Sequence, residues 1–288
     1  MPTLTDTTSL KRDERSAQHW YTAEGLAQHK VERATGTGLR NTNITDARKL
    51  GLLPSVTSVF KVSAKPQLER WKTSRIVEAS MNHKPAEGEN LESYTRRLED
   101  FMYDPVSDAA KLGSYGHDAI DRSFEGTPVP PELLAIINPF FAWLKEKGME
   151  VTEREKTLTN LEEGYAGTVD LMFTWGPKGQ RSQNQGILDF KFKDTIDKKK
   201  GKPKKIFIPD DYGMQIAAYG VAAYGEDWLD NPNALAANVI LSTTEPGRME
   251  VKKWDDLRRH YEGFKALLGY WIYCNKYNPR KQNATDQN

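Results

Sequence analysis

Cysteine is nearly absent from this chain of 288 residues, because Cys274 is the only one. A single cysteine cannot form an intramolecular disulfide. It also cannot supply the thiolates of an iron–sulfur cluster or of a cysteine-rich metal site. We therefore expect neither a disulfide nor an iron–sulfur cluster.

Long apolar runs are absent as well. No stretch approaches the roughly 20 apolar residues that a membrane helix requires, and the opening segment MPTLTDTTSLKRDER has none of the apolar character of a signal peptide. We therefore expect a soluble, cytoplasmic protein that has no membrane partner.

An excess of one charge is the third absence. The chain has 41 Lys and Arg residues against 40 Asp and Glu residues, a formal net charge of +1. The global charge therefore points to no anionic partner, and any basic surface must be local.

The ends of the chain are polar, and we expect residues 1–17 and 278–288 to be flexible. Between them the sequence predicts a single domain over residues 18–277. Its helical N-terminal part covers about 18–104, and its core covers about 105–253.

Apolar spacing predicts both helices and strands. The predicted helices are a segment capped near Ser55 that contains Leu68 and Trp71, Pro105–Phe124, PPELLAIINPFFAWLKEKG, DYGMQIAAYGVAAYG and about Asp255–Tyr277. The predicted strands are MEVTEREKTL, GYAGTVDLMFTW, GILDFKF, ANVILST and RMEVKKW. This mixture indicates an α/β or α+β fold in which helices flank a sheet, and it leaves the strand order open.

The strand GILDFKF carries an acid and an amine within an apolar run. Successive side chains of a strand point to opposite faces, so we expect Asp189 and Lys191 on one face and Phe190 and Phe192 on the other. A solvated face with a salt bridge is the simplest interpretation of an isolated D-x-K pattern. The surrounding residues favour a functional one.

Asp170 lies in the preceding strand, which is a natural hairpin partner of GILDFKF. Pairing of the two strands is expected to bring Asp170 opposite the region of Asp189. Two carboxylates and a backbone carbonyl, with waters completing the shell, suit Mg²⁺ or Mn²⁺ rather than zinc.

Two further positions join this acidic group. Glu153 and Glu155 are expected to share one face of the strand before it, where either one adds a carboxylate. His117 lies on a predicted helix, four residues after Gly113. A lone helical histidine is more often structural, but beside acidic residues it is a reasonable metal ligand or phosphate contact.

Such a group suits phosphodiester hydrolysis. A cation held by Asp170 and Asp189 polarises the phosphate and lowers the pKa of water. The ammonium of Lys191 orients the attacking water or stabilises the charged transition state.

A lysine-rich loop follows the candidate site. The segment FKFKDTIDKKKGKPKK contains eight lysines, including Lys193, Lys198, Lys199 and Lys200. A run of this kind is often only a solvated loop. Its position beside a hydrolytic centre predicts a clamp on the phosphates of a nucleic acid. The aromatic residues available for base stacking include Trp71, Tyr94, Tyr115 and Tyr212.

Taken together, these residues resemble the PD-(D/E)XK nuclease superfamily, in its RecB-like exonuclease branch. That branch includes phage recombination exonucleases and the mitochondrial genome-maintenance exonuclease. The matching elements span about residues 113–219. They are the segment from Gly113 to His117, Glu155 in EREKTL, Asp170 in GYAGTVD, Asp189 and Lys191 in LDFK, and Gln215 and Tyr219 in QIAAY.

The resemblance implies a restriction-endonuclease-like core, with a central mixed sheet flanked by helices. It implies metal ligation by His117, Asp170, Asp189 and the carbonyl of Phe190. Lys191 would be catalytic, and Glu155 would bind the metal through water or support the site. Gln215 and Tyr219 would position the DNA or the lysine. Val169 stands where many members have proline.

The function expected from the resemblance is that of a Mg²⁺- or Mn²⁺-dependent DNA exonuclease, used in phage recombination, replication or end processing. Its expected partners are DNA ends and a single-strand annealing or binding protein. A restriction-like or structure-specific endonuclease is the first alternative, because the fold supports both activities. A DNA-binding protein with an inactive nuclease core is the second.

Overall fold

The computed structural model describes residues 18–197 and 200–280. Residues 1–17 and 281–288, which belong to the ends expected to be flexible, lie outside the described residues, as do Lys198 and Lys199.

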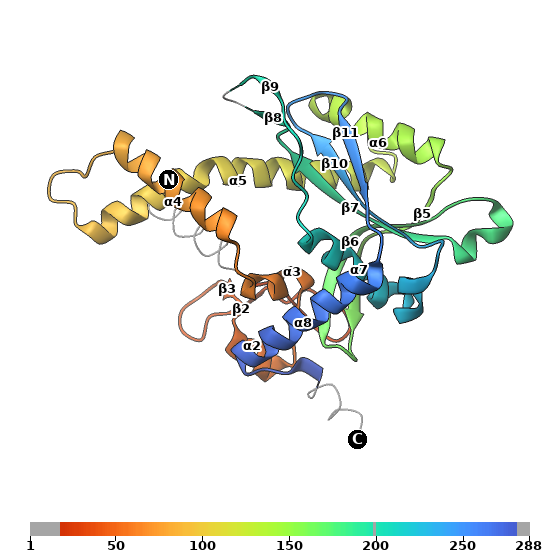
Figure 1. Ribbon diagram of the computed structural model, residues 1–288. Coiled ribbons are helices and arrows are strands. Elements are labelled where there is room, and N and C mark those ends of the chain that lie inside the picture. Colours follow the sequence, from red (N-terminus) through yellow and green to blue (C-terminus); the bar gives the residue numbers. More distant parts are fainter. Residues whose placement is uncertain (1–17, 198–199, 281–288) are drawn as a thin grey trace.

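A five-stranded mixed sheet forms the centre of the molecule (Figure 1), and it confirms the expected fold class. Its strand order is β11-β10-β7-β6-β5. The β7–β10 pair is parallel, whereas the other three pairs are antiparallel. The strands are β5 (Glu150–Asn160), β6 (Tyr165–Thr174), β7 (Gln185–Lys193), β10 (Leu235–Ser242) and β11 (Met249–Lys253). All five were predicted from the sequence patterns.

Helices cover both faces of this sheet (Figure 1). They are α2 (Ile44–Leu50), α3 (Val56–Val59), α4 (Pro66–Asn82), α5 (Leu91–Ser123), α6 (Leu134–Glu146), α7 (Asp211–Tyr224) and α8 (Leu257–Asn275). Short 3-10 turns occur at η1 (Phe60–Val62), η2 (Pro131–Leu133), η3 (Lys178–Gln183) and η4 (Glu226–Asp230). None of the described helices is both long enough and apolar enough to cross a bilayer.

Two apolar layers result from this arrangement. Ile120 of α5 and Phe140 of α6 pack with Phe190 on one face of the sheet. Ile216 of α7 and Phe264 of α8 pack with Val169, Ile187 and other residues on the other face. Each layer excludes water from one side of β6 and β7, so polar side chains on these strands need partners within the protein.

The predicted helix Pro105–Phe124 is wrong at its start, because α5 begins at Leu91. The side chain of Asn90 accepts a hydrogen bond from the backbone N–H of Ser93 at 2.9 Å and caps this earlier start. The helix then continues through position 105. Proline is favoured at the first position of a helix, which explains why the sequence pattern indicated a start there.

Helices α4 and α5 form a hairpin whose tip extends away from the sheet (Figure 1). Helix α4 has no buried residue over its 17 positions. Four of its large apolar side chains are exposed, namely Leu68, Trp71, Val77 and Met81.

The N-terminal part attaches to the sheet through small pairings. Strand β1 (Trp20–Tyr21) pairs with β4 (Leu53–Pro54), and β2 (Lys30–Glu32) pairs with β3 (Leu39–Asn41). Ser55 bridges to Ala166 of β6 and caps α3 with its side chain, which confirms the cap predicted at this serine. The helix does not continue to Leu68 and Trp71, which lie on the separate helix α4 after a break at residues 63–65.

Gly116, the residue directly before His117, lets α5 approach the sheet closely. A Cβ at Gly116 would lie 2.1 Å from Cζ of Phe192, whereas one at Gly113, on the same helix, would meet nothing within 4 Å. The absence of a side chain at Gly116 therefore sets the distance between α5 and β7.

We predict opposite effects for alanine at these two glycines. Gly116→Ala should lower the free energy of unfolding by about 1–3 kcal/mol, because it overpacks against Phe192. Gly113→Ala should raise it by up to about 1 kcal/mol, because alanine favours the helix. Urea denaturation measures both values, and equal effects would contradict the close approach at Gly116.

Candidate functional site

Strands β6 and β7 separate at Asp170. Their ladder runs from Thr174 opposite Gln185 to Leu171 opposite Leu188. At the next position the Oδ2 atom of Asp170 accepts the backbone N–H of Phe190 at 2.6 Å. The carboxylate is thus fixed where the strands part, and it lies opposite the region of Asp189, as the sequence predicted.

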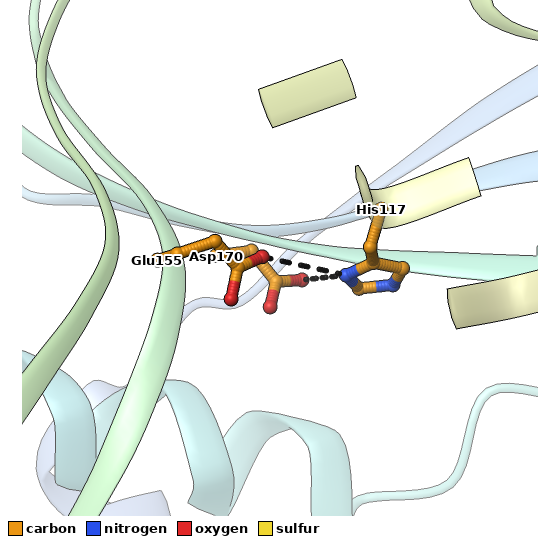
Figure 2. A group of neighbouring side chains, drawn as sticks. All are labelled: His117, Glu155 and Asp170. Atoms are coloured by element: carbon orange, nitrogen blue, oxygen red, sulfur yellow. Dashed lines mark ion pairs between the residues drawn. The ribbon is translucent and has the colours of Figure 1, made fainter. Parts of the chain in front are cut away.

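His117 and Glu155 meet Asp170 at this opening (Figure 2). The Nδ1 atom of His117 lies 3.5 Å from Oδ2 of Asp170 and 3.9 Å from Oε1 of Glu155. One ligand atom from each residue lies within 4.8 Å of the other two. Three residues that were predicted from separate segments therefore converge.

The two carboxylates hold a proton on His117. Burial by itself lowers the pKa of the imidazole, but hydrogen bonds to Asp170 and Glu155 and the charge of Asp170 outweigh burial and raise it to about 10. At neutral pH the ring therefore carries a positive charge that balances part of the acidic charge around it.

Glu155 reaches the group through an unusual backbone conformation. Its φ is 42°, in the left-handed region that residues other than glycine rarely adopt. It lies between the pairs Arg154–Leu171 and Lys156–Val169, beyond a β-bulge in the same strand. Strain of this kind costs about 1–3 kcal/mol and concentrates at functional sites.

Glu153, which was expected to share a face with Glu155, does not join the metal-ligand group. Its carboxylate forms an ion pair with Lys156 at 3.6 Å. The left-handed conformation of Glu155 breaks the simple alternation on which that expectation rested.

The donor set fits one small cation. His117, Glu155, Asp170 and Phe190 line a cavity of about 10 Å³, about the volume of one water-sized probe. Opposite ligand atoms of a bound Mg²⁺ lie about 4.2 Å apart. Small side-chain rotations would therefore bring the ligand atoms of this group to the distances that an ion requires. The N–H of Phe190 points toward Asp170. Because the N–H and C=O of one strand residue point to the same side, its carbonyl also faces the opening.

Asp189 lies beside this group and is not one of its three members. Its carboxylate is 2.5 Å from Nζ of Lys191, and the residue is only 2 % exposed. Burial raises the pKa of Asp189. Burial by itself lowers the pKa of Lys191, but the charges of Asp189 and Asp170 outweigh it and raise that pKa. The metal role predicted for Asp189 remains a prediction.

Two residues that the sequence did not single out support this buried pair. The side-chain amide of Asn238 donates to Oδ2 of Asp189 at 2.7 Å, and the indole N–H of Trp254 donates to Oδ1 of Asn238 at 2.7 Å. Asn238 is fully buried in β10. The available signal was a polar residue inside the apolar strand ANVILST, the same kind of signal that identified Asp189.

Tyr212, which was expected only as one of the aromatic residues available for base stacking, contacts the two lysines of the site. Its ring centroid lies 5.0 Å from Nζ of Lys191 and 4.9 Å from Nζ of Lys193. Lys193 also donates to the carbonyl of Phe207 at 3.0 Å. Burial and the neighbouring Lys191 lower the pKa of Lys193. One aromatic ring therefore contacts both ammonium groups.

Gln215 and Tyr219 lie on one side of α7, as predicted from their spacing. The amide of Gln215 donates to the hydroxyl of Tyr219 at 3.1 Å, and both residues are buried. Burial raises the pKa of Tyr219, so its hydroxyl stays neutral. A Cβ at Gly167 would lie 2.6 Å from this ring, so the glycine lets Tyr219 pack against β6.

The lysine-rich loop is anchored at its base. It contains the short strands β8 (Ile196–Asp197) and β9 (Lys202–Pro203). The N–H of Lys204 donates to the carbonyl of Thr195 at 2.8 Å, and the guanidinium of Arg248 donates to the carbonyl of Lys204 at 3.2 Å. Lys200 is exposed. The predicted substrate contacts Lys198 and Lys199 lie outside the described residues.

No protein-family model matches this chain, and a search of curated proteins finds no match either. The family resemblance therefore rests on the motifs in the sequence, and the chemistry of the site rests on its geometry.

We predict that Glu155→Asn stabilises the fold and weakens the metal site. Asparagine tolerates the left-handed region, so the free energy of unfolding should rise by about 1 kcal/mol. Affinity for Mn²⁺ should fall about tenfold or more, because one carboxylate is lost. Urea denaturation and titration calorimetry measure these two changes.

Lys156→Asn is the matched control for this variant. Lys156 is the next residue of β5 and is not one of the described residues with positive φ. Asparagine there should give no gain in stability, because it is disfavoured in strands. A similar gain in both variants would contradict strain at Glu155.

We also predict that metal binding releases a proton. The raised pKa of His117 means that the metal-free imidazole is protonated at neutral pH, whereas a metal ligand must be neutral. The apparent affinity for Mn²⁺ should therefore rise with pH below about pH 10, by up to about tenfold per pH unit. Calorimetry in buffers of different ionisation enthalpy counts the protons released.

His117→Gln is the control for this linkage. It should bind Mn²⁺ more weakly, and the proton released from the imidazole should be missing. Binding by the wild type that releases no proton between pH 7 and 8 would contradict the role of His117 as a ligand.

Proposed function

We propose that this protein is a divalent-metal-dependent deoxyribonuclease of the PD-(D/E)XK superfamily that hydrolyses phosphodiester bonds from DNA ends. The observation that carries the proposal is the meeting of two charged groups where β6 and β7 part. The group of His117, Glu155 and Asp170 suits a cation, and the buried pair of Asp189 and Lys191 lies beside it.

Mg²⁺ or Mn²⁺ is the cofactor that this donor set favours. Oxygen ligands with one imidazole suit these ions. Bound there, the ion would supply Lewis acidity and neutralise charge on the phosphate. The residues that would hold it are His117, Glu155, Asp170 and the carbonyl of Phe190. The carboxylate of Asp189 would lie next to them and add negative charge near the ion.

Lys191 would act as a cation rather than as a base. Its raised pKa keeps the amine protonated at neutral pH, so it cannot accept a proton from water. Its ammonium can instead hold the oxygen of the attacking water or stabilise the negative charge of the transition state. Asp189 and the ring of Tyr212 fix the position of this ammonium.

The other residues would position the reacting groups. The buried, hydrogen-bonded pair of Gln215 and Tyr219 on α7 would position the DNA or Lys191. Lys193 and the lysine-rich loop, including Lys198, Lys199 and Lys200, would bind the DNA backbone, because ammonium groups neutralise phosphates without reading sequence. A single-strand annealing or binding protein is the partner that we propose for a recombination role.

An endonuclease on the same fold is the competing function. Its discriminating substrate is covalently closed circular DNA, which an exonuclease leaves intact and an endonuclease cuts. A DNA-binding protein without activity is the other alternative, and it would bind DNA yet cleave neither form in Mg²⁺ or Mn²⁺.

We predict that Lys191→Met abolishes metal-dependent cleavage of end-labelled linear DNA, with a loss of about a hundredfold or more. The change keeps the length of the side chain and removes the charge. EDTA should stop the wild type completely. Gel analysis of the products over time measures the rate, and circular dichroism checks the fold of the variant.

Lys265→Met is the matched control. Lys265 also lies over an aromatic ring, that of Tyr261, and forms an ion pair with Glu262, but it is on α8, away from the site. Its cleavage rate should match that of the wild type. If purified Lys191→Met protein cleaved DNA at the wild-type rate, that result would contradict the proposed function.

A further inference from the structure

A second surface feature lies apart from the candidate metal site. It is a groove of about 940 Å³ between η1 and the base of the α4–α5 hairpin. Leu68, Trp71 and Tyr103 supply apolar and aromatic surface. Leu68 is 42 % exposed and Trp71 is 39 % exposed. Large side chains left open in this way mark interaction surfaces.

The charge in this groove is mainly positive. Lys61, Lys65 and Lys72 line it, together with one acid, Glu69. Lys72 is paired with Glu69 at 2.8 Å, and both side chains are partly exposed. An ion pair of this kind contributes little to stability, so a phosphate can replace the carboxylate. The surface therefore suits an anionic ligand that also offers flat apolar faces.

One edge of the groove lies near the candidate nuclease site. At one edge, Nζ of Lys65 lies 2.8 Å from Oδ2 of Asp211, the first residue of α7. The next residue, Tyr212, places its ring against the ammonium groups of Lys191 and Lys193. Two neighbouring residues of α7 therefore separate this edge of the groove from Lys191.

We propose that this groove binds single-stranded DNA beside the nuclease site, with a base stacked on Trp71 and phosphates paired with Lys61 and Lys72. The inference rests on the proposed function for the fate of the strand, although binding itself needs no cleavage. Unpaired bases expose the π-faces that stack on aromatic side chains. Duplex DNA hides those faces, so the groove selects a single strand.

Fluorescence anisotropy of a labelled oligothymidylate, recorded in EDTA so that nothing is cleaved, tests the proposal. Trp71→Ala should weaken binding by about 5- to 150-fold, the range for one lost base stack. Trp71→Phe should restore much of this loss. Lys61→Ala should reduce the slope of log affinity against log salt by about 0.7.

Tyr273→Ala is the matched control. Tyr273 is an aromatic residue of α8 that is 78 % exposed and does not line the groove. This variant should bind the oligonucleotide as the wild type does. The wild type should bind a blunt duplex more weakly than the single strand. Trp71→Ala should not change the affinity for the duplex.

Two results would overturn the proposal. One is wild-type affinity for the single strand in both Trp71→Ala and Lys61→Ala, which would leave the groove to a protein partner. The other is an equal loss on single strand and duplex. Cleavage is measured separately. If the wild type is active and neither Trp71→Ala nor Lys61→Ala changes binding, the groove alone is refuted. If Trp71→Ala weakens binding but the wild type cleaves no DNA, the nuclease activity alone is refuted.

Discussion

The hydrogen bond from the backbone of Phe190 to the carboxylate of Asp170 is the interaction on which the site depends. Where two strands separate, each buried N–H loses its partner at a cost of about 1–3 kcal/mol. Asp170 supplies the missing acceptor, so β6 and β7 can part without an orphaned donor. The opening then holds carboxylates where a closed sheet would hold only backbone.

Charge balance explains why the two halves of the site adjoin. His117 offsets Glu155 and Asp170 from α5, and Lys191 offsets Asp189 from within β7. A buried charge is tolerated only when it is paired and hydrogen-bonded. The two pairs are coupled, because Asp170 also raises the pKa of Lys191. The group of His117, Glu155 and Asp170 and the ammonium of Lys191 therefore share one electrostatic environment.

Local sequence patterns were enough to predict β5, β6 and β7 and the shared face of Asp189 and Lys191, because alternation and hairpin pairing act over short distances. They could not give the parallel pairing of β10, which depends on a crossover through α7. They also could not give the left-handed backbone of Glu155, which tertiary contacts impose. Asn238 was missed because its partner lies 49 residues away.

The support of Asp189 by Asn238 and Trp254 has a consequence for synthesis of the chain. The acidic and basic groups of the site lie between residues 117 and 191, yet the neutral donor and the indole that orients it come from β10 and the segment after β11. A ribosome exposes these segments after the charged residues. A nascent chain therefore carries the charged residues long before their environment is complete, and the site reaches its final form only when the C-terminal third has emerged.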